Sequence, residues 1–182
     1  MRTAVFAITG LFFLMTACQE INAPSSENED SEIITSIDSG SILINEISAM
    51  SELENEFGEA ADWLELYNAS DKRVELKFGS WSISDKLSNP DKYYLPEALI
   101  EPKGYLLIWC DKADTLTKDI HTNFKLSAKG ETISLYYNGN LMDQYTYDSV
   151  RTEQMYWARV EDGDPRWKAV DFATPAKSNV NF

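Results

Sequence analysis

The stretches 41-SILINEIS-48 and 62-DWLELYN-68 decide the fold class. Apolar and polar side chains alternate in both, so that Leu64 and Leu66 lie on one face of the second stretch and Glu65 lies on the other. A period of two residues is typical of a β-strand with one face on a core. The two stretches therefore predict neighbouring strands, with the acidic segment between them as their connection.

The same period continues along the chain. Further strand-like runs are "RVELK", "SWSIS", "KYYLP", "GYLLIWC", "ETISLYYN" and "LMDQYTYD", separated by the turn signals "NASD", "SNPD", "EPKG", "AKG" and "YNGN". Asn138-Gly139 within "YNGN" fits a type I′ turn, which predicts a hairpin. Short strands at roughly ten-residue spacing favour an all-β sandwich or barrel. No long helical period follows the N-terminal apolar run.

The N-terminus carries the features of a targeting segment. Arg2 precedes the apolar run "AVFAITGLFFLM", which is too short for a comfortable membrane span, and "MTAC" ends it. Small residues before a cysteine resemble the lipobox of bacterial lipoproteins. We therefore expect a signal peptide at 1–17, a lipid on Cys18 that binds the membrane, a flexible acidic tether over 18–40 and a folded domain over 41–182.

Several motifs, in order, resemble a known family. "ILINEIS", "DWLELYNASDKRVEL" and "SWSISD" resemble the opening of the bacterial lamin-tail domain. "EPKGYLLIWCD" and "HTNFKLSAKGETISLYYNGNLMDQYTY" resemble its middle, and "ATPAKSN" resembles its ending. The resemblance spans about residues 41–180 and implies an immunoglobulin-like β-sandwich. The chain departs from the pattern at Ser80 and Ala176, where glycine is the usual residue, so the turn geometry at both positions is open.

The resemblance implies a binding role rather than a chemistry. Nuclear relatives use the domain for contacts with protein and chromatin, and bacterial copies occur on secreted and surface proteins as binding modules. We therefore expect a lipid-anchored, non-enzymatic module of the bacterial cell envelope, at the outer membrane or cell surface, that binds a protein or a glycan. A net charge of −14 argues against a nucleic-acid partner. A small carboxylate-dependent hydrolase and a purely structural envelope protein remain as alternatives.

The acidic segment raises the question of a site. Seven carboxylates fall between residues 44 and 68, and no Lys or Arg occurs between Thr3 and Asp71. Glu46 and Glu65, inside the two strands, are the pair that a hydrolase would use. Hard oxygen ligands suit calcium, but no EF-hand pattern is present. We favour a solvated acidic loop over 51–60 that is dispensable for folding, and we assign no catalytic, metal or cofactor residues.

Two single residues predict structural roles. His121 is the only histidine, which makes a zinc site or a Ser–His–Asp triad a poor interpretation. It lies in "HTNFKLS", and we expect it to order a loop through hydrogen bonds. Cys110 ends the apolar run "YLLIWC", which predicts a buried thiol rather than a nucleophile.

The aromatic residues are more numerous than one small core needs. Adjacent tyrosines at 93–94 and 136–137 must send one ring to each face of their strands. Some rings are therefore available to stack on a sugar or to contact a protein partner. The predicted ligand-contacting aromatics are Tyr93, Tyr137, Tyr145 and Trp157. The alternative is that outward rings only form cross-strand pairs.

Overall fold

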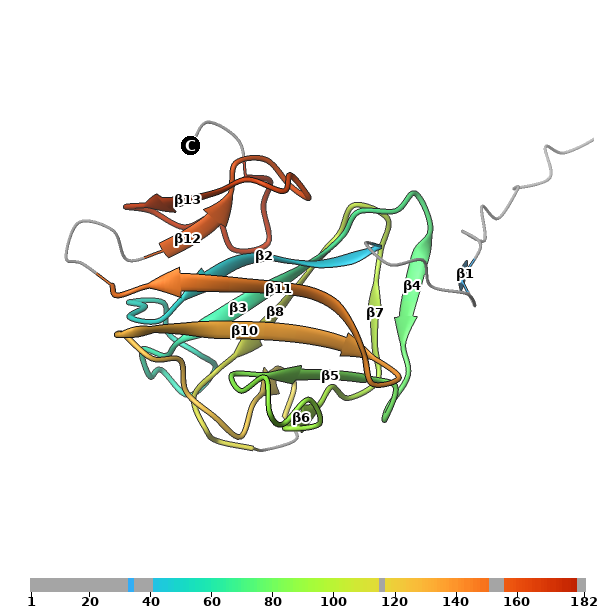
Figure 1. The fold of residues 1–182 in the computed structure, drawn as a ribbon, viewed down its shortest axis with the longest axis horizontal. Coiled ribbons are helices and arrows are strands. Elements are labelled where there is room, and N and C mark those ends of the chain that lie inside the picture. The colour runs from blue at the N-terminus through green and yellow to red at the C-terminus, as the bar shows by residue number, and fades with distance from the viewer. Residues whose placement is uncertain (1–32, 35–40, 115–116, 151–155, 180–182) are drawn as a thin grey trace, which may run out of the picture. The chain divides into compact units, whose positions relative to one another are not determined.

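A computed structural model describes residues 33–34, 41–114, 117–150 and 156–179. These residues form thirteen strands and no helix (Figure 1). The strands are β1 (Ile33–Ile34), β2 (Ile42–Ser48), β3 (Trp63–Asn68), β4 (Arg73–Leu76), β5 (Trp81–Ser84), β6 (Tyr93–Tyr94), β7 (Ala98–Ile100), β8 (Tyr105–Trp109), β9 (Ile120–His121), β10 (Gly130–Tyr137), β11 (Asn140–Asp148), β12 (Tyr156–Arg159) and β13 (Trp167–Val170). The expected signal peptide and Cys18 lie outside the described residues. Within the described part, no helix has the length and hydropathy to cross a membrane.

The strands form three sheets. One has four strands in the order β11-β10-β5-β6, one has six in the order β13-β12-β2-β3-β8-β9, and one has three in the order β1-β4-β7. In Figure 1 β10 and β11 of the four-stranded sheet lie in front of β3 and β8. The predicted all-β sandwich of the immunoglobulin-like type is confirmed.

The core lies between the facing sides of the two larger sheets. Leu64 and Leu66 of β3 meet Ile83 of β5 and Leu135 of β10 in one hydrophobic cluster, and all four are 0% exposed. Each such side chain contributes about 1.5–3 kcal/mol when it leaves water. The face predicted from the alternation in "DWLELYN" is therefore the core face.

A β-bulge in β2 decides where its polar residues point. The pairing with β3 shifts between Ile44 and Glu46, so Asn45 is the extra residue. Both Ile44 and Ile47 consequently reach the core, although their spacing breaks strict alternation. Glu46 is left directly opposite Glu65, on the far side of the six-stranded sheet.

That far side is also covered. Trp63, Trp109, Tyr156 and Val170 form a second hydrophobic cluster there, with Ala173 packed against it. Ala173 belongs to the C-terminal segment, residues 172–179, which follows β13. Both faces of the six-stranded sheet are therefore buried in its middle.

Two expectations on local structure concern the hairpin turn and the tether. Asn138 and Gly139 have φ of 48° and 75°, as a type I′ turn requires, and they join β10 to β11. The tether expected over 18–40 contains one described segment, Ile33–Ile34, whose backbone pairs in parallel with β4. The rest of that tether lies outside the described residues.

Candidate functional site

The acidic loop, residues 51–60, is closed around one buried asparagine. Asn55 is 6% exposed, and its Oδ1 accepts the backbone N–H groups of Phe57 at 3.0 Å and Glu59 at 3.1 Å. Its Nδ2 donates to Asp111 Oδ2 at 3.2 Å. Gly58, with φ of 75°, donates its N–H to the Asn55 carbonyl at 3.0 Å and closes the turn. Eight of the ten residues are exposed, so the loop is solvated as expected, but it is also ordered by internal bonds that the sequence did not predict.

The stem of the acidic loop is joined to β3. Trp63 Nε1 donates to Ser51 Oγ at 2.8 Å, and the Ala61 N–H donates to the Leu53 carbonyl at 3.2 Å. Without Ser51, the buried indole N–H of Trp63 would lose this acceptor, which costs about 1–3 kcal/mol. The loop therefore completes the strand that follows it.

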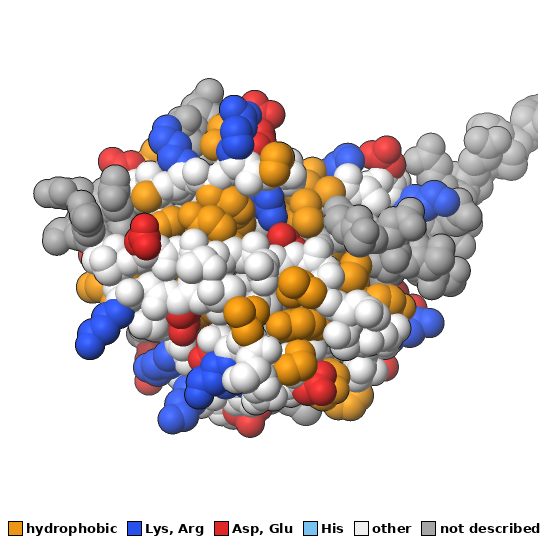
Figure 2. All heavy atoms as spheres, in the orientation of Figure 1, with side chains coloured by type: hydrophobic (Ala, Val, Ile, Leu, Met, Phe, Trp, Pro, Cys, Tyr) orange, Lys and Arg blue, Asp and Glu red, His pale blue; other side chains and the backbone are white. Residues whose placement is uncertain are grey.

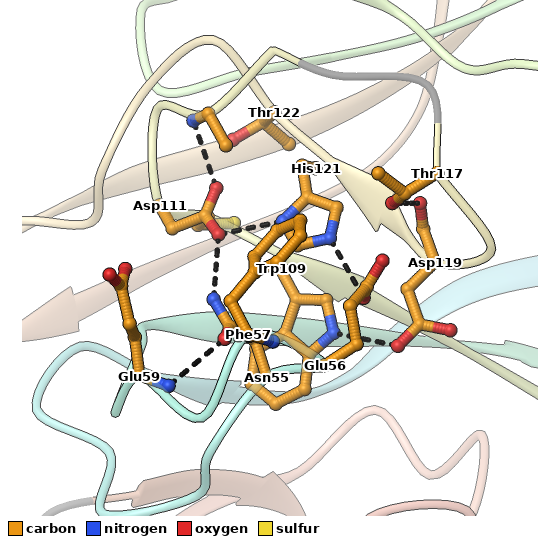
Figure 3. A network of polar contacts seen from close by, with 12 residues as sticks. Asn55, Glu56, Phe57, Glu59, Trp109, Asp111, Thr117, Asp119, His121 and Thr122 are labelled. Carbon is orange, nitrogen blue, oxygen red and sulfur yellow. Dashed lines mark hydrogen bonds and ion pairs between the residues drawn. The ribbon is translucent and has the colours of Figure 1, made fainter.

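His121 connects Glu56 of the acidic loop to Asp111, which follows β8 (Figure 3). Its ring is 0% exposed, with Nδ1 at 2.7 Å from Asp111 Oδ2 and Nε2 at 3.0 Å from Glu56 Oε2. The Phe57 ring packs on the imidazole, with the centroids 5.3 Å apart. This geometry agrees with the expectation that His121 orders a loop by hydrogen bonding.

The electrostatics favour a charged His121. Burial opposes the charge, but the hydrogen bonds to Asp111 and Glu56 raise the pKa of His121 above its ordinary value. Burial likewise acts to raise the pKa of Asp111, yet its bonds from the Ala113 N–H and from His121 lower it. Bonds from Thr117 and His121 lower the pKa of Glu56 to about 2. Both ring nitrogens have carboxylate partners, so neither is left for a metal or a substrate proton.

A second carboxylate pair lies on the far side of the six-stranded sheet. Glu46 and Glu65 are both 0% exposed. Glu46 accepts the Thr174 N–H at 3.0 Å, and Glu65 accepts the Ala176 N–H at 2.6 Å and Asn45 Nδ2 at 3.1 Å. Burial raises the pKa of Glu46 to about 7 and that of Glu65 to about 8, against the lowering effect of these bonds. The pair therefore holds the C-terminal segment.

Asn179 completes this attachment. Its Nδ2 donates to the carbonyls of Asn45 at 3.3 Å and Arg159 at 3.1 Å, and its N–H donates to Asp162 Oδ1 at 3.1 Å. A hydrolase needs its carboxylates open to substrate and water. Glu46 and Glu65 instead lie under the segment that they hold, which disfavours the hydrolase alternative. Among the described residues, no group of three or more His, Cys, Asp or Glu side chains is arranged to hold a metal ion.

The predicted aromatics from the tyrosine pairs lie on the core side. Tyr93 and Tyr137 are half-buried against the core, and Tyr137 packs on Trp81 with centroids 4.9 Å apart. The outward members are Tyr94, which is 41% exposed, and Tyr136, which is 7% exposed. The prediction that each pair sends a ring to each face holds, but the choice of Tyr93 and Tyr137 as surface rings is corrected to Tyr94.

The other two predicted aromatics belong to strands β11 and β12. Tyr145 is half-buried and stacks on Trp167, with centroids 3.8 Å apart and planes 10° apart. Trp157 is 5% exposed and packs on Tyr147, so its prediction as a ligand contact is corrected to a core role. Arg159 lies over the Trp167 ring at 4.9 Å, a cation–π contact that the sequence did not predict.

Cys110 occupies the core. It is 0% exposed, and burial raises its pKa well above the ordinary value. A thiol of this kind is a poor nucleophile. The prediction of a buried thiol is confirmed.

A sequence model of the Lamin Tail Domain family matches residues 35–149, which is more than half of the chain. The match ends before β12, so β12, β13 and the C-terminal segment lie beyond it, whereas the resemblance in the sequence reached residue 180. No curated protein matches the chain.

Proposed function

Because the chain belongs to the Lamin Tail Domain family, we propose that it is a lipid-anchored, non-enzymatic module of the bacterial cell envelope that binds a protein or a glycan. The family and its fold do not by themselves fix a chemistry, since function resides in the site. The proposal therefore depends on what the side chains of this domain are free to do.

The groups capable of chemistry are already engaged. His121 has a carboxylate at each ring nitrogen, Glu46 and Glu65 accept N–H groups of the C-terminal segment, and Cys110 is fully buried. An enzyme keeps such groups within reach of a substrate. Their use in internal bonds supports a binding role over hydrolysis.

The observation that carries the proposal is the set of large apolar side chains on the surface of this very acidic domain. Figure 2 shows hydrophobic side chains gathered over the seam between β11 and β12 and again over the four-stranded sheet. The largest exposed ones include Met50, Phe57, Phe78, Leu87, Tyr94 and Leu141. Exposed apolar groups with polar surroundings are typical of contact sites for protein or sugar.

The lipid anchor is supported by the sequence around Cys18. The apolar run and "MTAC" place this cysteine where bacterial lipoproteins carry their acyl chains. Each buried methylene adds about 0.8 kcal/mol of membrane affinity, so several chains make a stable anchor. Localisation at the outer membrane or cell surface follows from this proposal.

The anchor is tested by fractionating cells that express the wild type or Cys18→Ala. We expect the wild type in the detergent-extracted membrane fraction and the variant in the soluble fraction. Equal amounts of both proteins in the membrane would contradict the anchor.

Binding is tested on the soluble Cys18→Ala protein, with a glycan array and with crosslinking in envelope extract followed by competition with unlabelled protein. Saturable binding to one glycan class or one protein supports the proposal. Binding to neither would favour the purely structural alternative.

A further inference from the structure

We propose that the acidic loop is a protein-docking surface, and that its partner is a polypeptide that presents apolar side chains flanked by Lys or Arg. This inference rests on the proposed binding function and names the surface and the chemistry of the partner. It stands on three properties of the loop: exposed apolar side chains, a fixed backbone and exposed carboxylates.

Three of the exposed apolar side chains lie in one short segment. Phe57 is 54% exposed, Leu53 is 37% exposed, and Met50, immediately before the loop, is 53% exposed. Aromatic and long apolar side chains carry most of the binding energy in protein interfaces. Phe57 is therefore the expected anchor, with Leu53 and Met50 beside it in the chain.

The loop holds its anchor in place before any partner arrives. The Phe57 N–H is bound by Asn55, and its ring rests on the buried His121. Glu56 is held by His121, and Ser51 by Trp63 (Figure 3 shows the first of these contacts). Ordering a side chain on binding costs conformational entropy, and a fixed loop has less of this cost left to meet.

The charges around the anchor select the partner. Glu52, Glu54 and Glu59 are exposed, and among the described residues none of the three forms an ion pair. A partner with Lys or Arg around its apolar contact would complement them and associate faster at low salt. Phosphate backbones and anionic lipid surfaces would be repelled.

The alternative binding surface is the outer face of the four-stranded sheet. Tyr94 and Leu141 are exposed there, on the two outermost strands, and the positions between them are Ser82 and Tyr136, which are buried. An uncharged face with an exposed ring suits a neutral glycan more than a basic peptide. Binding at this face is therefore an outcome that the experiment must separate from binding at the loop.

The experiment is a nuclear magnetic resonance titration of the full-length Cys18→Ala protein. The probes are three short synthetic peptides with the same Leu and Phe residues, flanked by Lys, Ser or Glu, and a neutral glucan oligosaccharide. We expect the Lys peptide alone to shift amide signals of residues 50–60. Phe57→Ser should weaken this binding about tenfold, as the loss of a hot-spot side chain does. Neutralising Glu52, Glu54 and Glu59 with Gln should weaken it and reduce its dependence on salt.

Matched controls separate the loop from the general negative charge. Phe78→Ser removes a ring that is 71% exposed on the turn between β4 and β5, and a triple change neutralises the exposed Glu97, Asp148 and Asp171. Both controls should leave binding unchanged, and urea unfolding should show that Phe57→Ser and a second variant, Leu53→Ser, stay folded.

Three results would overturn the inference. One is binding of the Lys peptide that Phe57→Ser and Leu53→Ser leave unchanged, and another is equal weakening by the control triple change. The third is the absence of shifts in residues 50–60 with any peptide. If that absence is accompanied by shifts on β5, β6, β10 and β11 with the oligosaccharide, binding lies at the sheet face and the proposed binding function is upheld.

Discussion

Two carboxylate clusters in this domain have pKa values that are shifted in opposite directions. In one cluster, Glu56 of the acidic loop and Asp111, which follows β8, lie on either side of a histidine, whose proton keeps both carboxylates ionised. On the far side of the six-stranded sheet, Glu46 and Glu65 lie opposite each other with backbone N–H groups as partners, and burial raises the pKa of both. Glu56 and Asp111 thus serve as charged groups, whereas Glu46 and Glu65 serve as hydrogen-bond acceptors whose charged form is disfavoured by burial.

The carboxylates of the two clusters therefore respond to pH with opposite signs. His121, whose pKa is raised, adds stability that is present below its ordinary pKa and lost as the pH rises. The lowered pKa values of Glu56 and Asp111 give stability that is present above about pH 4 and lost as the pH falls further. The raised pKa values of Glu46 and Glu65 give stability that is present below about pH 4.5 and lost as the pH rises towards 7 and 8. We expect the domain to be most stable near pH 5.

The largest expected effect tests whether the acidic loop is part of the fold. Replacing residues 51–60 with a short Gly-Ser linker removes one partner each from His121, Asp111 and Trp63, which should cost about 3 kcal/mol. Urea unfolding measures this cost beside Leu66→Ala, a core change expected to cost roughly 2–5 kcal/mol. A cost below about 1 kcal/mol would instead support the expectation from the sequence that the loop is dispensable for folding.

The second prediction concerns the buried pair. Between pH 5 and pH 7 the free energy of unfolding should fall by roughly 2 kcal/mol, because Glu46 and Glu65 lose protons that they hold only in the folded state. The double change Glu46→Gln and Glu65→Gln keeps an acceptor for each N–H, so it should flatten this fall. Urea unfolding at several pH values measures it, and an unchanged slope in the variant would show that the pair does not titrate.

The third prediction addresses the histidine. Asp111→Asn removes one of its two charged partners, so the pKa of His121 should decrease and the domain should lose about 1 kcal/mol of stability at pH 6. A magnetic resonance titration of the imidazole signals reads the pKa directly. If the pKa of His121 does not decrease, Glu56 rather than Asp111 holds the charge.

The smallest predicted effect concerns one residue with a positive φ beside each cluster. Ala176 has φ of 57° and Gly58 has φ of 75°, both in the left-handed region that favours glycine. Ala176→Gly should therefore stabilise the domain by a few tenths to about 1 kcal/mol, and Gly58→Ala should destabilise it by about 1 kcal/mol. Thermal unfolding of both variants tests the opposite signs. A destabilising Ala176→Gly would mean that the alanine side chain contributes more than its backbone strain costs.

The sequence by itself determined the all-β class, the hairpin turn at Asn138-Gly139 and the core face that carries Leu64 and Leu66. These follow from local physics, since alternation, turn chemistry and apolar side chains act within a few residues. The single histidine and the apolar context of Cys110 likewise predicted their structural roles, because each depends on the residue type and its near neighbours.

Only the tertiary structure decided the rest. The Asn45 bulge placed Glu46 opposite Glu65, and the C-terminal segment that covers them meets Glu46 across 128 residues of chain. Alternation predicted that Tyr93 and Tyr94 face opposite sides, but the pairing with Ile83 and Ser82 fixed which ring faces the core. The internal order of the acidic loop was missed for the same reason. Its carboxylate count is local, whereas its histidine partner lies 65 residues away.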